Sequence, residues 1–305
     1  MRRIRHIATT RAGTRVAVGA YETRVAVWDI AQEEQISEFD TPLDGSSDNL
    51  AITPDGRFVV AGQYGAKGTG CYDAETGEAV WIHRELKRLG HASIAPDGKH
   101  AYLGFDEGSG RIIDMTSGET LEKLRGIREM AISPFGDAVV LGGQGQRIIR
   151  LDGGQTIAKL KRDDIFGCGF APGLVCINGL RAFEPNDNTP WIRMRWCVDT
   201  ASGEEIWRHE WTDPVSTFGG SYDEQENVFL ALESKSGGGG PRTLARLDVE
   251  TGQVIDRVLL PDVAWEIGFC SKGAELLCPD GTIVCTRSGE ALRTLDFPDT
   301  SDANA

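Results

Sequence analysis

The residues of this sequence that could carry metal or acid–base chemistry are few and widely separated. The histidines are His6, His83, His91, His100 and His209. No two of them have the i, i+4 or His-x-His spacing at which two imidazoles reach one metal ion. The chain also lacks the Gly-x-Ser-x-Gly pattern of a hydrolase nucleophile, and Gly219-Gly220-Ser221 fits the end of a strand. We therefore predict no metal ligands, no catalytic residues and no cofactor.

The seven cysteines are odd in number, and none lies in a Cys-x-x-Cys motif. Cys168 and Cys176 have the same eight-residue spacing as Cys270 and Cys278, so each pair could approach across a turn between two strands. A reactive thiolate needs a basic neighbourhood, which the sequence around these four residues does not show. We interpret them as small buried side chains, and the whole set as reduced thiols.

A short motif that recurs along the chain would position these side chains. An Asp is followed three residues later by Thr or Ser, then Gly, then Glu or Gln, at Asp73, Asp114, Asp199 and Asp248. Weaker copies follow Asp29 and Asp152 and begin at Arg287. In such a turn the Asp side chain caps the backbone and Gly supplies a positive φ. Seven copies in 305 residues give a period of about 44, the size of one four-stranded propeller blade.

Each period divides into four short strands, here a to d, separated by Gly, Pro and Asp turns. In the second period they are expected over residues 49–53, 57–64, 68–74 and 79–85. We predict an all-β fold, a seven-bladed β-propeller of four-stranded antiparallel blades, as a single domain over residues 1–298. The blades are expected near 3–41, 49–85, 89–126, 127–163, 164–211, 215–261 and 263–298, with a disordered tail at 299–305. We expect no outer strand to be exchanged between the first and last blades.

Two propeller motifs stand in the sequence. Trp28-Asp29 and Gly90-His91 resemble the Trp-Asp and Gly-His dipeptides of WD-repeat propellers, although most blades here lack both. Asp73 to Trp81 and Asp199 to Trp207 resemble the Asp-x-x-Thr-Gly-x-x-x-Trp motif of quinoprotein propellers, with Ser202 replacing Thr in the second. The first resemblance implies a His91–Asp106 pair in the third blade at most. The second implies docking between blades, which concerns architecture rather than chemistry.

The charge balance narrows the class of partner. The chain carries 32 Lys and Arg against 46 Asp and Glu, a formal net charge of −14, which disfavours nucleic acid and anionic lipid. The basic N-terminal stretch is not followed by an apolar run of signal-peptide length, and no run approaches about 18 apolar residues. We expect a cytoplasmic protein without a direct nucleic-acid or membrane partner, and a small-molecule ligand is disfavoured.

Charge is also distributed unevenly between the two ends of the blades. In a four-stranded meander the a–b and c–d turns lie at one end, where Asp and Glu predominate, and the d–a and b–c connections lie at the other. The d–a connections carry seven bases, diluted by nearby acids: Arg84, Lys87, Arg88, Arg125, Arg128, Lys161 and Arg162. Solvated turns that keep the protein soluble are one interpretation. The other is an arc of bases that binds an acidic segment of a partner protein.

The same end should carry two long b–c loops, residues 184–190 and 234–241, the second with four consecutive glycines. Trp191 and Trp211 flank exposed loops and are candidate interface anchors, whereas Trp207 is expected in the core between blades. The candidate partner-binding residues are therefore these two tryptophans and the seven bases.

We interpret the chain as a non-catalytic scaffold or recognition subunit of a larger cytoplasmic complex that binds another protein through the d–a/b–c end. The alternative is a propeller enzyme or small-molecule sensor with a site in the central channel. Such a site needs ionisable residues on several a strands, where the plausible candidates are Glu266 and Arg128.

Overall fold

The computed structural model describes most of the chain. The described residues are 4, 6–19, 24–43, 49–62, 68–143, 146–152, 154–160, 163–181, 192–212, 215–235, 242–261 and 267–297. Side chains are not described at 163, 164, 166, 181, 215–219 and 235. The tail expected at 299–305 and nearly all of the two long loops lie outside these residues.

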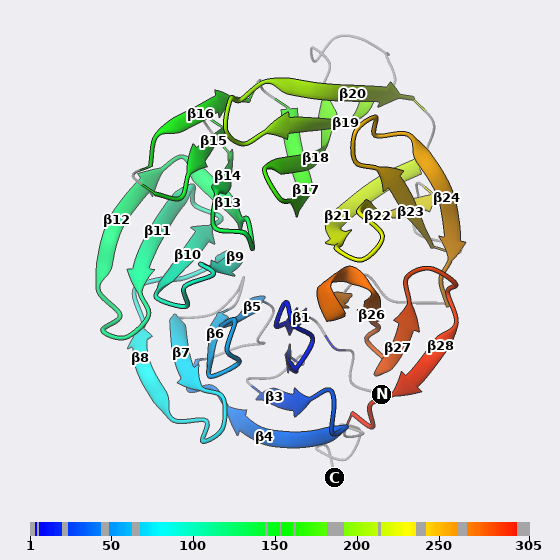
Figure 1. Ribbon diagram of the computed structural model, residues 1–305. Helices are drawn as coiled ribbons and strands as arrows, with labels where there is room; N and C mark the ends of the chain where they lie inside the picture. The colour runs from blue at the N-terminus through cyan, green and yellow to red at the C-terminus, as the bar shows by residue number, and fades with distance from the viewer. Residues whose placement is uncertain are drawn as a thin grey trace. The chain divides into compact units, whose positions relative to one another are not determined.

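The described residues form seven four-stranded sheets whose strands pair in sequence order, and the fold is the predicted seven-bladed β-propeller (Figure 1). The first three blades are β1 (His6–Thr9), β2 (Arg15–Gly19), β3 (Arg24–Asp29), β4 (Glu34–Asp40); β5 (Asn49–Ile52), β6 (Phe58–Gly62), β7 (Thr69–Asp73), β8 (Ala79–His83); and β9 (Leu89–Ile94), β10 (His100–Phe105), β11 (Ser109–Asp114), β12 (Thr120–Arg125). The fourth and fifth are β13 (Ile127–Ile132), β14 (Ala138–Gly143), β15 (Arg147–Arg150), β16 (Thr156–Lys159); and β17 (Asp163–Ala171), β18 (Leu174–Arg181), β19 (Ile192–Asp199), β20 (Glu205–Trp211).

The sixth and seventh blades complete the series. They are β21 (Val215–Asp223), β22 (Val228–Lys235), β23 (Thr243–Asp248), β24 (Val254–Leu259); and β25 (Gly268–Cys270), β26 (Glu275–Leu277), β27 (Thr282–Cys285), β28 (Ala291–Thr294), with a short 3-10 helix, η1 (Ser271–Gly273), between β25 and β26. Within the described residues, the first and last sheets each consist of four consecutive strands and exchange none.

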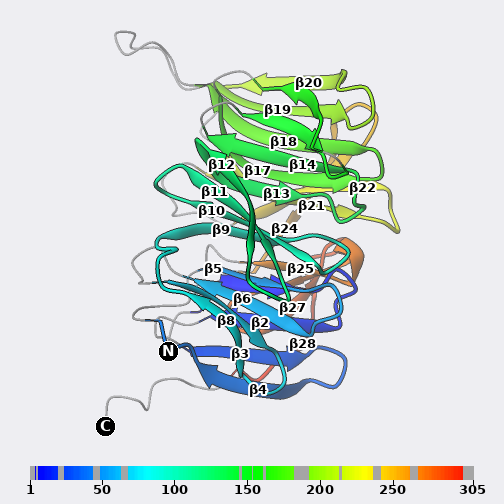
Figure 2. The ribbon, with the colours of Figure 1, turned by 90° about the vertical axis from the view of Figure 1, so that its left-hand side faces the viewer.

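Two compact units can be distinguished, and each is described by itself. Unit 1 comprises Met1–Met130, Val263–Cys285 and Glu290–Ala305, and unit 2 comprises Ala131–Asp262 and Thr286–Gly289. In unit 2, β17 to β20 pair side by side in one sheet (Figure 2). The single-domain range 1–298 stays a prediction.

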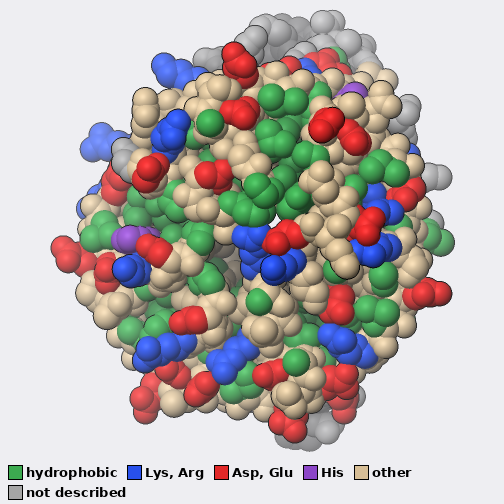
Figure 3. All heavy atoms as spheres, in the orientation of Figure 1, with side chains coloured by type: hydrophobic (Ala, Val, Ile, Leu, Met, Phe, Trp, Pro, Cys, Tyr) green, Lys and Arg blue, Asp and Glu red, His purple; other side chains and the backbone are tan. Residues whose placement is uncertain are grey.

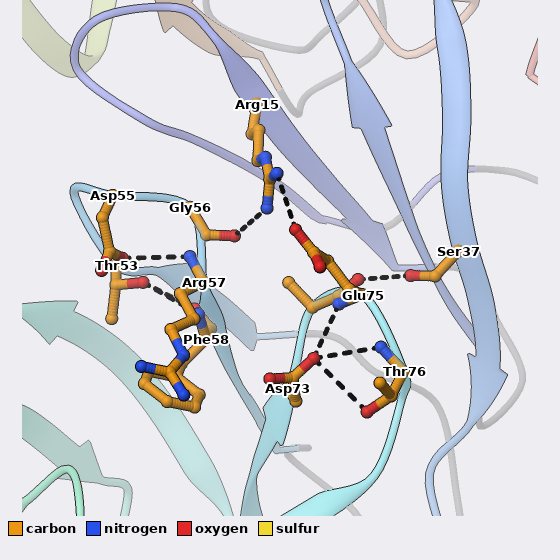
Figure 4. A network of polar contacts seen from close by, with 11 residues as sticks. Arg15, Ser37, Thr53, Asp55, Gly56, Arg57, Phe58, Asp73, Glu75 and Thr76 are labelled. Carbon is orange, nitrogen blue, oxygen red and sulfur yellow. Dashed lines mark hydrogen bonds and ion pairs between the residues drawn. The ribbon is translucent and has the colours of Figure 1, made fainter.

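The repeated c–d turn forms as its residue types predict. In the second blade the Asp73 Oδ1 accepts hydrogen bonds from the backbone N–H groups of Glu75 and Thr76, both at 3.0 Å (Figure 4). The Thr76 hydroxyl lies 3.3 Å from the same oxygen, and Gly77 has a φ of +72°. The turns at Asp114, Asp199 and Asp248 repeat these bonds. The motif therefore closes each blade locally.

Neighbouring blades are held together by apolar clusters formed from facing sheets. In unit 1 one cluster joins the first and second blades, another joins the second and third, and a third joins the first and seventh. In unit 2 clusters join the fourth blade to the fifth and the fifth to the sixth. Each sheet buries its faces against its neighbours because a single four-stranded sheet has no core of its own.

The d strands supply a specific contact between blades. The Trp81 Nε1 donates a hydrogen bond to the Met115 carbonyl at 3.0 Å, and a Cβ added to Gly118 would overlap the Trp81 ring. Trp207 makes the same contacts with the Val249 carbonyl, at 2.9 Å, and with Gly252. The docking role implied by the quinoprotein-like motif and the core position of Trp207 are both confirmed.

Other blades use different side chains for this contact. Phe39 packs on Gly77 in unit 1, while Ile157 packs on Gly203 in unit 2. These two pairs were not predicted from the sequence, because the Asp-x-x-Thr-Gly-x-x-x-Trp motif is recognised by its Trp and these blades use Phe or Ile for the contact. The position after the turn needs only an apolar side chain, and the glycine of the next blade supplies the space.

Close approach between backbones explains the small residues of the inner strands. Gly104 on β10 lies against β13, where an added Cβ would overlap the Arg128 carbonyl oxygen. In unit 2, a Cβ added to Gly169 on β17 would lie 3.0 Å from the Ser221 carbonyl oxygen on β21, which is a looser but still tight approach. Larger residues at these positions would push neighbouring blades apart.

Candidate functional site

Five of the seven bases predicted to bind a partner can be described, and all lie in unit 1. Arg84, Lys87 and Arg88 lie in the β8–β9 connection, and Arg125 and Arg128 lie at the β12–β13 connection. All five residues are exposed. Within the described part of the chain, none of the five side chains forms a salt bridge or a hydrogen bond. We call these five residues the basic arc.

A single turn lies between the two halves of the basic arc. The Asp106 N–H donates to the Arg88 carbonyl at 3.2 Å, and the Gly126 N–H donates to the Gly108 carbonyl at 2.6 Å. Asp106 and Gly108 belong to the b–c turn of the third blade, whose Gly108 N–H bonds to the Phe105 carbonyl at 2.9 Å. Both d–a connections are therefore fastened to one turn, which gives the basic arc a defined backbone.

Lys161, Arg162, Trp191 and Glu266 lie outside the described residues, so their part in a site stays a prediction. Arg128, the other candidate for a site in the central channel, is exposed.

Trp211 lines a groove between the fifth and sixth blades, inside unit 2. The groove has a volume of about 460 Å³. Its lining residues are Arg195, His209, Glu210, Trp211, Glu233, Gly252, Gln253, Val254 and Arg257. It therefore combines aromatic side chains with charges of both signs.

Three charged side chains form one wall of the groove, from the buried Arg195 and Glu233 to the exposed Arg257. The Glu233 carboxylate lies between two guanidinium groups, with its Oε2 2.8 Å from the Arg257 Nε and its Oε1 3.4 Å from an Arg195 Nη. Arg195 is 4 % exposed and Glu233 is 5 % exposed, whereas the Arg257 side chain is 52 % exposed. The Arg195 Nε also donates to the Asn178 Oδ1 at 2.9 Å. We call Arg195, Glu233 and Arg257 the arginine–glutamate triad.

Strand β20 places the aromatic side of the groove. Trp207, His209 and Trp211 alternate along it, and because side chains alternate between the faces of a strand they all face the sixth blade. The His209 Nε2 lies 2.8 Å from the Thr251 carbonyl, and the Arg195 guanidinium lies 5.4 Å from the Trp211 ring centroid. Trp211 is thus both a wall of the groove and a cover over a buried charge.

The sequence analysis singled out Trp211 but missed the triad. Arg195 and Glu233 stand inside apolar strand sequences, MRWCV and LALES. A charged residue in such a run was the available signal, because buried charges are rare unless paired. Its partner could not be identified from the repeat pattern.

The His91–Asp106 pair suggested by the WD-repeat resemblance does not form. The His91 Nδ1 and the Asp106 Oδ2 are both buried without a hydrogen-bond partner. His91 instead lies near His6, whose Nδ1 accepts a hydrogen bond from the Leu50 N–H at 3.2 Å. Burial, with a smaller contribution from His91, lowers the pKa of His6 to about 4. Burial also lowers the pKa of His91.

The cysteine register differs from the expected pairs. Cys168 lies opposite Ile177, while Cys176 lies opposite Cys197 on the adjacent strand. The cysteines are free thiols, and Cys176 and Cys197 are buried. Burial raises the pKa of Cys176 to about 12. The interpretation of these thiols as unreactive, small apolar side chains fits this environment.

The acidic turns are offset more than the sequence analysis expected. In unit 1 the Arg15 guanidinium lies 3.0 Å from the Glu75 carboxylate and also donates to the Gly56 carbonyl (Figure 4). In unit 2 an Arg246 Nη, on β23, lies 3.7 Å from the Glu226 carboxylate. Acidic and basic side chains are interspersed on the face that Figure 3 shows. Arginines on strands provide bases that a list of turn residues omits.

Two searches of the described residues gave no candidates. These residues contain no group of three or more His, Cys, Asp and Glu side chains that could hold a metal ion. Their helices include none that is long and apolar enough to span a bilayer.

Comparison with known proteins places the fold in a broad group. A family model described as outer membrane protein assembly factor BamB matches residues 2–130. No curated protein sequence matches the chain.

Solved propellers resemble the chain along nearly its whole length. The Myceliophteria thermophila Cps50 (Swd1) β-propeller domain has a TM-score of 0.69 at 14 % identity, covering 95 % of each chain. Hydrazine synthase of Kuenenia stuttgartiensis has a TM-score of 0.68 at 14 % identity, covering 95 % of this chain and 94 % of that chain. U3-55K has a TM-score of 0.67 at 10 % identity, covering 91 % of this chain and 88 % of that chain.

These findings and the seven sheets define the class of protein. The chain is a seven-bladed β-propeller with quinoprotein-like and WD-repeat-like features, as its motifs predicted. One of its structural neighbours is named as an enzyme, so the fold alone does not separate catalytic from non-catalytic roles.

Proposed function

We propose that this propeller is a non-catalytic scaffold or recognition subunit that binds another protein through the d–a/b–c end of its blades. The observation that carries the proposal is the basic arc. Five exposed bases without salt-bridge partners among the described residues lie on both sides of one turn, in a protein whose net charge is −14.

The chemistry of the basic arc indicates an acidic partner. Unpaired guanidinium and ammonium groups attract carboxylates, and complementary charge sets both the register and the association rate of a complex. Nucleic acid and anionic lipid carry charge over a wide area and would be repelled by the overall negative charge, whereas a short acidic segment can contact the basic arc alone. An acidic protein segment is therefore the partner class that fits best.

The backbone supports this role. The hydrogen bonds from Asp106 to Arg88 and from Gly126 to Gly108 hold both d–a connections on the same turn. A surface that is already ordered loses less conformational entropy when a partner binds. The family model that matches residues 2–130 is described as an assembly factor, which is a role of the same kind.

The test is affinity capture from the native host with a charge-reversed variant. We expect Lys87→Glu/Arg88→Glu/Arg125→Glu/Arg128→Glu to lose the captured partner by at least about tenfold, because each substitution replaces attraction with repulsion. The amount of each co-purified protein is measured by quantitative mass spectrometry against an untagged strain.

A matched control reverses four exposed bases elsewhere: Arg57, Lys99, Lys123 and Lys159. This control should keep the partner. Equal capture by the wild-type protein and the basic-arc variant would refute the proposed docking surface.

The alternative function is a catalytic or small-molecule site in the central channel. The observation in its favour is the similarity to hydrazine synthase, an enzyme by name. A ligand retained after purification and contacted by several a strands would favour this alternative.

A further inference from the structure

We propose that the groove between the fifth and sixth blades binds a carboxylate group on an acidic segment of a partner protein. The inference rests on the proposed function and adds a second contact, in unit 2, with defined chemistry.

The arginine–glutamate triad gives one wall of the groove a positive charge. The triad has two guanidinium groups on one carboxylate and therefore a net charge of +1. The Glu210 carboxylate at the groove lies 3.8 Å from an Arg208 Nη, but that guanidinium pairs more closely with Glu205, so the positive charge of the groove lies on the side of the triad. Arg195 is buried and has little water around it, so a further anion at the triad would stabilise its charge.

The guanidinium groups of the triad also have hydrogen-bond donors that Glu233 does not use. Glu233 engages the Arg257 Nε and one Nη of Arg195, and Asn178 engages the Arg195 Nε. Within the described part of the chain, both Nη groups of Arg257 and the Nη1 of Arg195 have no hydrogen-bond partner. A carboxylate is planar, matches the fork of a guanidinium group and accepts two parallel hydrogen bonds.

The exposure of the groove favours a protein segment over a free small molecule. The Arg257 side chain, which has the most unused donors, is 52 % exposed and lies at the rim of the groove. Small-molecule sites usually enclose most of the ligand surface. A carboxylate on a longer segment needs no such enclosure, because the rest of the segment can extend past the exposed residue Gln253.

The experiment measures binding of a fluorescein-labelled peptide of alternating Glu and Gly by fluorescence anisotropy. The matched Gln-and-Gly peptide is the uncharged probe. We expect the Glu peptide to bind, the Gln peptide to bind at least about tenfold more weakly, and added salt to weaken the Glu peptide. In the basic-arc variant, where only the groove is left to bind the peptide, Arg257→Gln should reduce affinity about tenfold or more, and Arg257→Lys by less, because Lys keeps the charge and loses the fork.

Lys159→Gln in the same background is the control, since Lys159 is an exposed base on β16 of unit 2 and does not line the groove. It should leave the affinity for the Glu peptide unchanged. Thermal unfolding of each variant checks that Arg257→Gln remains folded, and Arg257→Lys provides a second measurement. Unchanged affinity in both Arg257 variants would overturn the inference.

Two further arms separate this inference from the proposed function. The basic-arc variant should still bind the Glu peptide through the groove. Loss of binding in that variant, with full binding in the single variant Arg257→Gln, would overturn the groove site and leave the basic arc supported. Succinate that displaces the peptide at concentrations well below those at which the peptide itself binds would indicate a small-molecule carboxylate site, which also contradicts a protein segment.

Discussion

At the scale of single residues, burial decides which ionisable groups can act. Arg195 and Glu233 are charged and buried, but each has a partner of opposite charge. His6 and His91 lie close together without a carboxylate bonded to either, so burial favours their neutral forms. Burial therefore makes a partner of opposite charge necessary for Arg195 and Glu233, and it makes His6 and His91 sensitive to acid.

The buried histidine predicts a pH dependence of stability. The pKa of His6 is 6.5 in an unfolded chain and about 4 in the folded protein, so the unfolded state binds the proton more tightly. The contribution is fully present above about pH 6.5 and is lost as the pH falls towards 4. We expect a loss of about 2 kcal/mol in the free energy of unfolding between pH 7 and pH 5.

Chemical denaturation at pH 7 and pH 5 measures this loss. His6→Gln keeps a hydrogen-bond acceptor and removes the titrating group, so it should be less sensitive to pH than the wild-type protein. An equal pH dependence in both proteins would contradict the assignment to His6.

At the scale of elements, the c–d turn and the d strand do separate jobs. The turn closes its own blade through the Asp side chain, and its glycine receives a side chain from the preceding blade. Trp81 and Trp207 add a hydrogen bond to this packing. Docking between two blades therefore depends on the d strand of one blade as much as on the c–d turn of the next blade.

Trp81→Phe tests that contact. Phe keeps most of the apolar area but leaves the buried Met115 carbonyl without the Trp81 donor, so we expect a loss of about 1–2 kcal/mol. Trp81→Ala should cost about 3–5 kcal/mol because it also leaves a cavity. Urea denaturation measures both.

Val80→Ala is the control, because Val80 is adjacent on β8 and 38 % exposed. Its effect should stay within about 0.5 kcal/mol. If Trp81→Phe were equally neutral, the hydrogen bond would not contribute to docking.

At the scale of the whole molecule, contacts of unit 1 join blades from the two ends of the chain. The Thr9 hydroxyl donates to the Phe269 carbonyl at 2.5 Å, and the Trp28 and Phe297 rings make an edge-on contact with centroids 5.5 Å apart. The first and seventh blades share one apolar cluster. No described strand is exchanged, so these blades are held by side-chain packing and by hydrogen bonds such as the one that the Lys272 N–H donates to the Arg11 carbonyl at 3.0 Å.

Phe297→Ala tests this arrangement. Loss of a partly buried aromatic contact should lower the free energy of unfolding by about 2 kcal/mol. Hydrogen exchange should increase in both β1 and β27, although these strands are far apart in the sequence. Leu292→Ala, at a position 50 % exposed on β28, should change neither quantity. An increase confined to β27 would contradict the shared cluster.

The sequence predicted the blade number, the turns and the docking tryptophans, because these depend on contacts within one period or between corresponding positions of adjacent periods. It also identified the basic arc as a set of bases on connections, although Lys161 and Arg162 lie outside the described residues. It did not predict the hydrogen bonds of the third-blade turn that bring Arg88 and Gly126 to the same place.

By itself, the sequence determined the repeating sheet and its turn chemistry, since an Asp, a Gly and a few alternating apolar residues specify a local structure wherever they occur. The tertiary structure decided which charged side chains meet. Arg195 and Glu233 are 38 residues apart, and Glu233 and Arg257 are 24 apart, neither of which is a multiple of the period. Their contact depends on how the fifth and sixth blades are aligned with each other. The packing of Trp207 on Gly252 sets that alignment, and no periodic pattern in the sequence encodes it.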